Sequence, residues 1–243
     1  MIEQYVTIVT GASQGIGQAI ALKFAAEGHA VAISGRNETN LQRTAEMIQR
    51  TSGQPVLTVP ADLRDMEQIP GIVEKVVGKW GRIDVLVNNA GILHLKPFLE
   101  ISLEEYQEMM DVNVRAVFFL TQKVLPHMIS RRSGTLINIA SLAGKNGFKS
   151  GTGYGASKFA LRGFAASLMM EVREYDIRVV TVFPGSVNTP MLNRSPNAPL
   201  PETMLQAEDV AHAAYQAFAV HPRAMISEID IRPANPKKNQ EKK

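Results

Sequence analysis

Short apolar runs rich in β-branched residues alternate along the chain with longer segments whose apolar residues recur at helical spacing. Most of the short runs are continuously apolar, which is typical of parallel strands covered by helices on both faces. We expect strands at residues 5–10, 30–34, 55–59, 83–88, 134–140, 177–183 and 226–231. Strand and helix in strict succession predict right-handed crossovers and an α/β fold, with about seven parallel strands in a doubly wound sheet.

Two helix boundaries are visible in the sequence. The apolar segment 15–28 ends in Gly28, a typical residue at a helix C-terminus. The segment 102–128 opens with Ser102 and Glu105, the spacing of a capping box. Ligands of such folds bind at the carboxyl ends of the strands, so the loops that follow the strands are the segments to search for a site.

The chain has 243 residues, of which 45% are hydrophobic, and this suits one α/β domain over residues 1–235. The longest irregular segment is rich in Pro and Asn, and we expect a mobile substrate lid at about 186–206. The last eight residues, 236–243, carry four Lys and one Glu, which account for the whole net charge of +3. We expect a disordered basic tail there.

Composition excludes several classes of function. A body of balanced charge with no aromatic residues in its basic tail argues against a nucleic-acid partner. The absence of Cys excludes disulfides and thiolate chemistry, and the five His residues show no metal-ligand spacing, so no metal is expected. No apolar run reaches the roughly 18 residues that span a bilayer. We therefore expect a soluble, unprocessed cytoplasmic protein without a membrane partner.

A glycine-rich stretch, "TGASQGIG" (10–17), lies between the first expected strand and the helix that follows. Gly11 suits a tight turn, Gly15 allows the backbone to approach a pyrophosphate, and Gly17 allows helix and strand to pack closely. The helix N-terminus offers free N–H groups to phosphate, and Ser13 adds a hydroxyl. An ordinary strand-to-helix turn is the alternative, but this position in the chain favours dinucleotide binding.

The spacing of these glycines resembles that of the short-chain dehydrogenase/reductase superfamily. "NNAG" at 88–91, Asn113, Ser141 and "YGASK" with Tyr154 and Lys158 follow in the order found in that family. The resemblance covers residues 1 to about 190 and implies a Rossmann-type fold with helices on both faces of the sheet. Jointly these motifs are highly specific, although each alone is modest.

The resemblance also implies a set of cofactor contacts. Asp62 would bond the adenine amino group, with Leu63 lending its backbone N–H. "NNAG" would lie beneath the ribose, and Val187 and Thr189 would meet the nicotinamide carboxamide. The full set is Gly11, Ser13, Gln14, Gly15, Ile16, Gly17, Arg36, Asp62, Leu63, Asn89, Ala90, Gly91, Tyr154, Lys158, Pro184, Gly185, Val187 and Thr189.

The residues after the second expected strand bear on the choice of nicotinamide cofactor. Gly35 and Arg36 stand where an acidic residue would bind a ribose 2′-hydroxyl, and a guanidinium there could bind a 2′-phosphate. Gln14 occupies a position at which many NADP-preferring relatives carry a basic residue. We expect NADP(H) to be preferred, with NAD(H) possible.

Tyr154 and Lys158 are four residues apart in an expected helix, so they share one face. A nearby ammonium stabilises phenolate, and we expect it to lower the Tyr154 pKa from about 10. Tyr154 is then the proton donor when a carbonyl is reduced. Ser141, at a strand end, would steady the developing alkoxide, and the resemblance implies that Asn113 is the fourth catalytic residue, with a water leading toward Lys158.

These patterns predict an NADP(H)-dependent oxidoreductase that transfers hydride between nicotinamide and a carbonyl/alcohol substrate. The alternatives are an NAD-dependent dehydrogenase of the same family and a regulatory protein that binds the dinucleotide without chemistry. An epimerase or dehydratase would usually carry a larger substrate domain. Residues 142–148, Met191 and Leu192 suggest an apolar substrate pocket. Relatives commonly associate through the helices that hold Asn113 and Tyr154, so a homodimer or homotetramer is expected.

Overall fold

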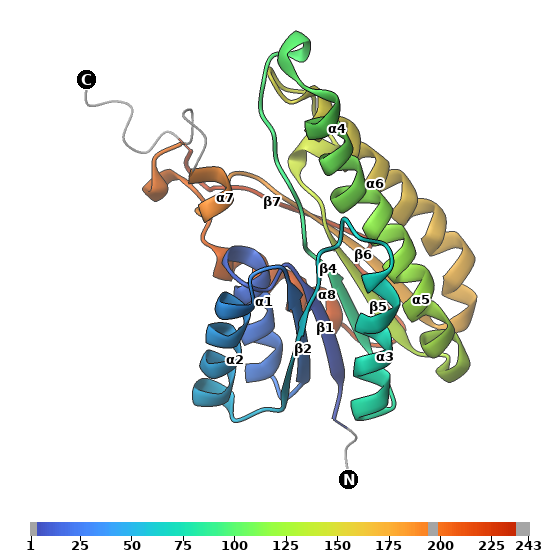
Figure 1. The fold of residues 1–243 in the computed structure, drawn as a ribbon. Helices are drawn as coiled ribbons and strands as arrows, with labels where there is room; N and C mark the ends of the chain where they lie inside the picture. Colours follow the sequence, from blue (N-terminus) through green and yellow to red (C-terminus); the bar gives the residue numbers. More distant parts are fainter. Residues whose placement is uncertain (1–3, 194–198, 237–243) are drawn as a thin grey trace.

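A computed structural model describes residues 4–193 and 199–236 of the protein (Figure 1). Within these ranges a single parallel sheet has the strand order β3-β2-β1-β4-β5-β6-β7. Every expected strand is confirmed to within two residues at each end, which confirms the doubly wound α/β fold. The strands are β1 (Val6–Thr10), β2 (Ala30–Gly35), β3 (Val56–Pro60), β4 (Val85–Asn88), β5 (Gly134–Ile139), β6 (Ile177–Pro184) and β7 (Glu228–Ile231).

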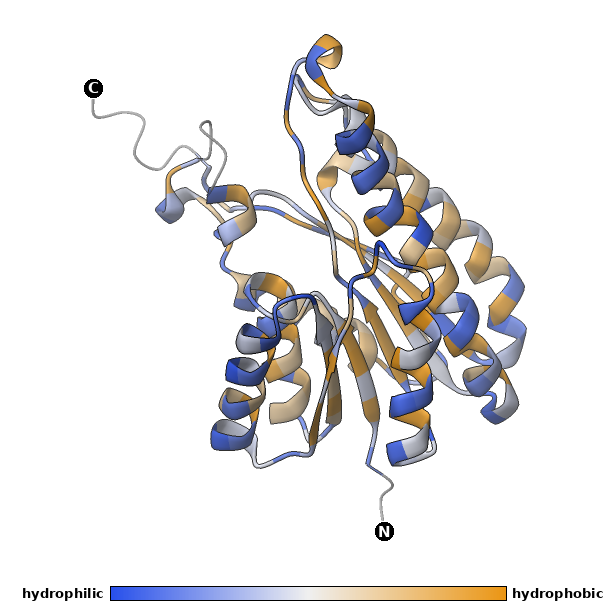
Figure 2. Ribbon diagram, viewed as in Figure 1, coloured by the Kyte–Doolittle hydropathy of each residue, from blue (hydrophilic) through white to orange (hydrophobic). Residues whose placement is uncertain are grey.

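Helices cover both faces of the sheet. One core cluster joins it to α1, α2 and α8, and a second joins it to α3, α5 and α6. Figure 2 shows the apolar strands enclosed between these helices. The α-helices are α1 (Gly15–Ala26), α2 (Glu38–Ser52), α3 (Gln68–Trp80), α4 (Leu103–Met110), α5 (Ala116–Arg131), α6 (Thr152–Val172), α7 (Pro190–Asn193) and α8 (Ala207–Ala219). Short 3₁₀ turns are η1 (Phe98–Glu100), η3 (Leu142–Gly144), η4 (Arg173–Tyr175) and η5 (Pro201–Thr203).

Both expected helix boundaries are present. Helix α1 ends at Ala26, and Gly28 follows with φ 92°, which a side chain would disfavour. Ser102 and Glu105 form a complete capping box at the start of α4. The expected long helix continues into α5 through a π-helical segment, η2 (Asp111–Arg115), so it is not one regular α-helix.

The sheet topology sets the position of the cleft. Strand order reverses at β1, which pairs with β2 on one side and with β4 on the other. The crossover connections leave in opposite directions from this point, so a crevice opens at the carboxyl ends of β1 and β4. The loops after β1, β2, β3, β4 and β6 all reach this edge (Figure 1).

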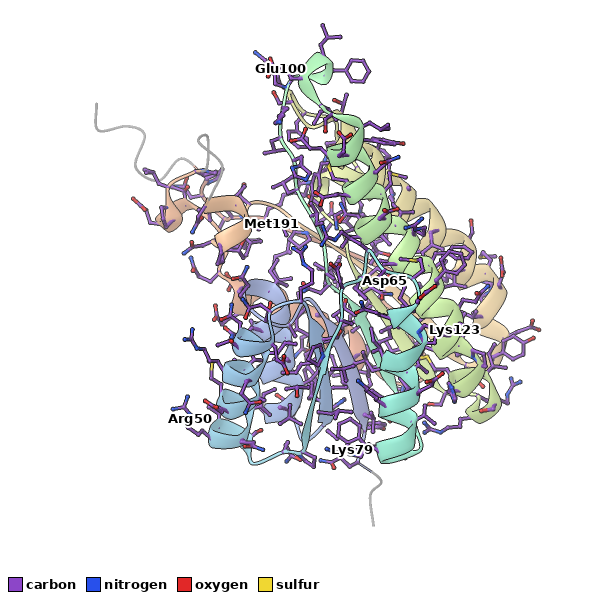
Figure 3. All side chains as sticks on the ribbon, viewed as in Figure 1. Arg50, Asp65, Lys79, Glu100, Lys123 and Met191 are labelled. Atoms are coloured by element: carbon purple, nitrogen blue, oxygen red, sulfur yellow. The ribbon has the colours of Figure 1, made fainter. Side chains whose placement is uncertain are left out.

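The proposed lid and tail fall partly outside the described residues. Within the lid range, α7 and η5 are described, whereas residues 194–198 are not. Of the tail, only Pro236 is described. The single domain, the mobile lid and the disordered tail therefore stay predictions. At the outer surface, Figure 3 shows exposed charged side chains such as Arg50, Lys79 and Lys123.

Asp84 anchors the opposite edge of the sheet, just before β4. Its side chain is 4% exposed, and its Oδ2 accepts the Val6 N–H at 2.8 Å. Its Oδ1 accepts from Arg82 Nη2 at 2.8 Å and from Arg131 Nη2 at 2.9 Å. The carboxylate thus connects β1, β4 and α5, and its charge is matched by two guanidinium groups.

Replacing Asp84 with Ala should lower the free energy of unfolding by about 3 kcal/mol, because two partly buried guanidinium groups and a backbone N–H would lose their partner. Urea unfolding followed by circular dichroism measures the change. A matched control is Glu27→Ala, which removes a more exposed pair with Lys23 and should cost less than about 1 kcal/mol. Equal losses in the two variants would contradict the anchoring role.

Candidate active site

Hydrogen bonds at the reversal of strand order tie the loop after β4 to the loop after β1. Thr10 Oγ1, buried at the end of β1, accepts the N–H groups of Asn89 at 3.0 Å and Ala90 at 3.1 Å. The Asn89 Nδ2 donates to the carbonyl oxygens of Thr10 at 2.9 Å and Gly11 at 3.3 Å. The two loops therefore form one floor for the cleft.

The glycine-rich loop adopts the tight turn that the sequence predicts. Gly11 and Gly15 have φ angles of 65° and 59°, which favour glycine. A Cβ on Gly11 would lie 2.8 Å from the Cα of Ala90, and one on Gly17 would lie 2.4 Å from the Asn89 Nδ2 and from the Gly11 carbonyl oxygen. Glycine at positions 11 and 17 therefore allows the loop after β4 to pack closely against the glycine-rich turn.

The N-terminus of α1 presents a favourable environment for an anion. The N-cap residue, Gln14, makes no side-chain capping bond, and the first turn holds no acidic residue. The N–H groups of that turn and the positive end of the helix dipole therefore face the cleft, which Ser13, Gln14, Gly15 and Ile16 line.

The cleft at this edge has a volume of about 730 Å³. It brings together most of the residues that the sequence indicates for a cofactor. Those that line it are Gly11, Ser13, Gln14, Gly15, Ile16, Arg36, Asp62, Leu63, Asn89, Ala90, Gly91, Tyr154, Lys158 and Thr189. Gly17, Asn113, Ser141, Pro184, Gly185 and Val187 lie outside the lining.

The residues after β6 position one wall of the cleft. Pro184 ends β6, and the Gly185 N–H donates to the Ile231 carbonyl oxygen at 2.8 Å, which holds this turn against β7. Val187 is buried and forms an isolated bridge with Leu205. These residues therefore support the wall, whereas Thr189 and the start of α7 line it.

Asn113 lies in the π-helical segment and is fully buried. Its Oδ1 accepts the Ile92 N–H at 2.8 Å, and its Nδ2 donates to the Ile92 carbonyl oxygen at 2.9 Å and to Ser157 Oγ at 3.0 Å. The amide thus finds three partners within the chain, and the water expected to lead toward Lys158 stays a prediction. Asn113 thereby fixes the loop after β4 against α6.

Tyr154 and Lys158 lie on the same face of α6, as expected, and both line the cleft. Lys158 is 4% exposed, and its Nζ donates to the Ile139 carbonyl oxygen at 3.1 Å. Its Nζ lies 5.7 Å from the centroid of the Tyr154 ring. Ser141 caps η3 by accepting the Ala143 N–H at 3.1 Å and also hydrogen-bonds the Tyr154 hydroxyl. The phenol and the ammonium therefore lie at one end of the cleft, and the Ser141 hydroxyl, outside the lining, is bonded to the phenol.

Burial is the largest cause of the pKa shifts of Tyr154 and Lys158. It raises the pKa of Tyr154 to about 12, and the bond with Ser141 offsets only part of the increase. Burial also lowers the pKa of Lys158 to about 8. The expected lowering of the Tyr154 pKa is therefore wrong, because desolvation of the phenol raises this pKa by more than the hydrogen bond with Ser141 lowers it.

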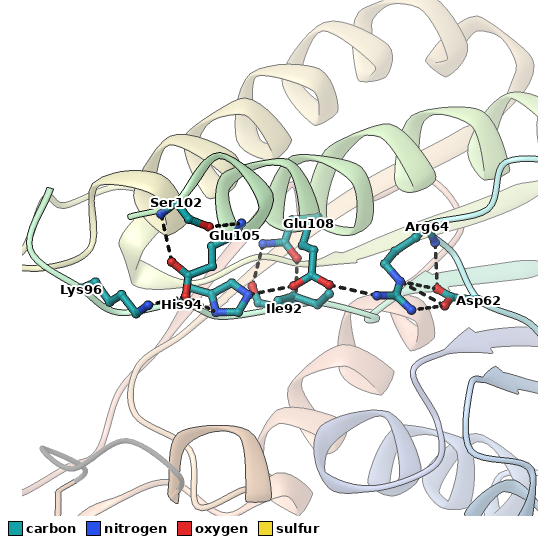
Figure 4. A network of polar contacts seen from close by, with 9 residues as sticks. Asp62, Arg64, Ile92, His94, Lys96, Ser102, Glu105 and Glu108 are labelled. Atoms are coloured by element: carbon teal, nitrogen blue, oxygen red, sulfur yellow. Dashed lines mark hydrogen bonds and ion pairs between the residues drawn. The ribbon is translucent and has the colours of Figure 1, made fainter. Parts of the chain in front are cut away.

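The loops after β2 and β3 form the other end of the cleft. Arg36 is exposed after β2, and Asp62 and Leu63 follow β3. The Asp62 carboxylate is bound by Arg64, which also contacts Glu108 on α4 (Figure 4). The Arg64 guanidinium holds the pKa of Asp62 below its usual value. His94 contacts Glu108 at 3.1 Å in the same network. Among the described residues no group of three or more His, Asp or Glu could hold a metal ion.

Several cleft residues were missed by the sequence analysis. Arg64, Ile92 and Val112 line the cleft, as do Asn37 and Asn40 at the start of α2. Asn37 is the N-cap of α2 and accepts the Asn40 N–H at 2.8 Å. Its cap-forming position two residues after a strand could have revealed it. The other four carry no local signal.

Comparisons with known proteins point to one family. The family model described as short chain dehydrogenase matches residues 5–199. An uncharacterized oxidoreductase of Staphylococcus saprophyticus is 34% identical over 232 residues, which cover 96% of this chain and 98% of that protein. A 3-oxoacyl-(acyl-carrier-protein) reductase of Thermotoga maritima is 38% identical over 197 residues, 80% of this chain and 79% of that protein.

Solved structures share the fold along almost the whole chain. A metagenomic short-chain oxidoreductase in complex with NADP has a TM-score of 0.83 and 32% identity, covering 94% of this chain and 96% of its own. A 3-ketoacyl-(acyl-carrier-protein) reductase from Brucella melitensis complexed with NADH has a TM-score of 0.88 and 28% identity, covering 97% and 100%.

The bonds of Asn113 suggest a test of its supporting role. Asn113→Ala should lower the free energy of unfolding by about 2 kcal/mol, because the N–H and carbonyl groups of Ile92 lose their partner inside the protein. Ser157→Ala removes one of the three bonds and should cost about 1 kcal/mol. Urea unfolding of both variants measures the difference, and equal costs would argue against a special role for the Ile92 contacts.

Proposed function

Because the chain belongs to the short-chain dehydrogenase family, it is an oxidoreductase, and we propose that it transfers hydride between NADP(H) and a carbonyl/alcohol substrate, with Tyr154 as general acid/base. The observation that carries this proposal is the single cleft that joins the glycine-rich loop to Tyr154 and Lys158. One end suits a phosphate-bearing dinucleotide and the other holds a proton donor, so binding and chemistry share one space.

The described residues fit a dinucleotide. Gly11 and Gly15 line the cleft without a side chain, and the first turn of α1 offers N–H groups to a pyrophosphate. By family resemblance, Asp62 and Leu63 would hold the adenine, Asn89 to Gly91 would lie beneath a ribose, and Lys158 would bind ribose hydroxyls. Thr189, in the wall beside α7, would contact the nicotinamide carboxamide, with Pro184, Gly185 and Val187 behind it.

Preference for NADP(H) is proposed from the end of β2. Gly35 and Arg36 follow that strand, and no carboxylate stands there to repel a 2′-phosphate. A guanidinium is well suited to a phosphate because it can donate two parallel hydrogen bonds. The NADP complex of the metagenomic oxidoreductase supports this choice, and the NADH complex of the Brucella reductase keeps NAD(H) as the alternative.

The proton chemistry follows from burial. When bound, a nicotinamide dinucleotide supplies or accepts the hydride. Tyr154, with a pKa raised to about 12, stays protonated at neutral pH, so its hydroxyl can donate a proton to a carbonyl oxygen during reduction. The Ser141 hydroxyl would share the developing negative charge on that oxygen. The Lys158 ammonium would stabilise the phenolate left on Tyr154, and Asn113 would keep α6 in place.

The substrate side of the cleft has apolar walls. Met191 lies in the lining of the cleft, and Figure 3 shows it on α7. Leu142 and Phe148 lie outside the lining of the cleft, and in this proposal they would contact the part of the substrate that extends beyond it. These residues support a small-molecule substrate with an apolar part next to its carbonyl group.

Association of copies is proposed from an exposed aromatic surface. Phe118 and Phe119 on α5 and Phe159 on α6 are 46%, 41% and 46% exposed, although large apolar side chains are usually buried. Helix α6 carries Tyr154, and α5 follows the π-helical segment that carries Asn113. A homodimer or homotetramer formed through these helices would cover the three rings. Among the described residues, no helix is both long and apolar enough to cross a membrane.

Replacing Tyr154 with Phe should lower turnover by about a hundredfold to ten-thousandfold, because the proton donor is lost. The NADPH dissociation constant, measured by fluorescence, should change little. Tyr175→Phe, in η4 away from the cleft, is the matched control and should keep full activity. Retained turnover in Tyr154→Phe would refute the assignment. Wild-type protein that binds NADPH but reduces no member of a broad carbonyl panel would favour the regulatory alternative.

The pKa of Lys158, lowered to about 8, predicts a pH dependence. Below pH 8 the Lys158 side chain is a charged ammonium and can assist binding and catalysis, whereas above pH 8 it loses its proton and its charge. Hence kcat/KM for NADPH should be flat below about pH 8 and fall above it, because this ratio reports groups of the free enzyme. Lys79→Met, on the outer surface (Figure 3), should leave the profile unchanged. A profile that stays flat to pH 10 would contradict the expected loss of charge.

A further inference from the structure

A chain of charged side chains runs along the rim of the cleft, from the loop after β3 to α4 and the loop after β4 (Figure 4). Arg64 lies at its centre. Its Nε donates to the two Asp62 oxygens at 3.1 and 3.0 Å, and its Nη2 donates to Oδ2 at 2.6 Å. Its Nη1 donates to Glu108 Oε1 at 2.9 Å. One guanidinium therefore binds two carboxylates.

Arg36 faces the same end of the cleft from the loop after β2. It lines the cleft together with Asp62 and Arg64, and its charge contributes to lowering the Asp62 pKa, after the larger contribution of Arg64. No hydrogen bond or ion pair joins Arg36 to any other residue in 4–193 or 199–236. Both arginines thus lower the pKa of Asp62, but only Arg64 is hydrogen-bonded to its carboxylate.

We infer that Arg64 is a specificity-determining residue for the adenosine 2′-phosphate, acting through Asp62 and Arg36. By occupying both Asp62 oxygens, Arg64 keeps that carboxylate from pairing with Arg36 and neutralises its charge. The Arg36 guanidinium is left available for a phosphate. This inference rests on the proposed function, because it presumes a dinucleotide in the cleft.

The charge balance without Arg64 shows why the effect is selective. Asp62 would lose its guanidinium partner at the rim, and Glu108 would keep its hydrogen bond with His94 at 3.1 Å. Asp62 would attract the Arg36 guanidinium and repel a 2′-phosphate. A ligand with a 2′-hydroxyl carries no charge at that position, so its affinity depends much less on Arg64.

A structural role for Arg64 predicts a different pattern. The loop keeps two bonds that do not use the guanidinium: the Arg64 N–H donates to Asp62 Oδ1 at 3.0 Å, and the Asp62 N–H donates to Gln68 Oε1 at 2.9 Å. Substitution of the Arg64 side chain therefore leaves the backbone turn supported. If the turn were nevertheless disrupted, every adenosine ligand would bind less well, whether or not it carries a 2′-phosphate.

The test compares ligands that differ only at the 2′ position. In Arg64→Gln, the dissociation constants of NADPH and adenosine 2′,5′-bisphosphate should rise at least about fivefold, as expected for one charge at a partly exposed site. Those of NADH and adenosine 5′-monophosphate should change less than about twofold. Calorimetry or protein fluorescence measures binding without turnover. The fivefold change should shrink at high salt.

Two further variants make the comparison specific. Arg162→Gln is the matched control, because Arg162 has the same 41% side-chain exposure and also binds a carboxylate, Glu228, but lies outside the cleft lining. It should change neither affinity. In an Arg36→Gln background, Arg64→Gln should have little further effect on NADPH binding, because Arg64 acts through Arg36.

If Arg64→Gln weakens the binding of NADPH and NADH equally, or changes neither, the inference is overturned. The proposed function stands in that case as long as the wild-type protein prefers NADPH. Wild-type protein that binds none of the four ligands would overturn both.

Discussion

The hydrogen bonds between Thr10 and Asn89 are the contact on which the rest of the cleft depends. A parallel sheet brings the carboxyl ends of its strands to one edge, but it does not by itself hold the loops that leave that edge. Thr10 Oγ1 accepts two N–H groups of the β4 loop, and the Asn89 side chain returns two bonds to the glycine-rich turn. The glycine-rich turn, the loop after β4 and the start of α1 are thus positioned together.

Desolvation explains the chemistry at the other end of the cleft. The same packing that aligns α6 with the end of β5 buries Tyr154 and Lys158, and burial favours the neutral form of each group. A neutral phenol is the form that a proton donor needs. In the proposed reaction, the Lys158 ammonium would therefore act mainly after the phenol has given up its proton, when a negative charge has formed on Tyr154.

Local patterns explain how much could be predicted from the sequence. The strands, the turn at Gly11, the end of α1 at Gly28 and the capping box at Ser102 depend on neighbouring residues, and all are present. The direction of the Tyr154 pKa shift depends on the burial of the phenol between α6 and the rest of the protein. The spacing of four residues between Tyr154 and Lys158 could not predict it. The Arg64–Glu108 pair joins residues 44 positions apart, so no local pattern indicates it.

The π-helical segment at Asp111–Arg115 changes the phase of the helix that runs from α4 into α5. Each extra residue in a helix rotates the following side chains by about 100° around the axis. Before the segment, α4 turns Glu105 and Glu108 toward the charged rim of the cleft. After it, α5 turns Leu120 and Val124 toward the sheet. Because of this one irregular turn, the helix contributes first to the solvent-exposed rim of the cleft and then to the buried core beneath the sheet.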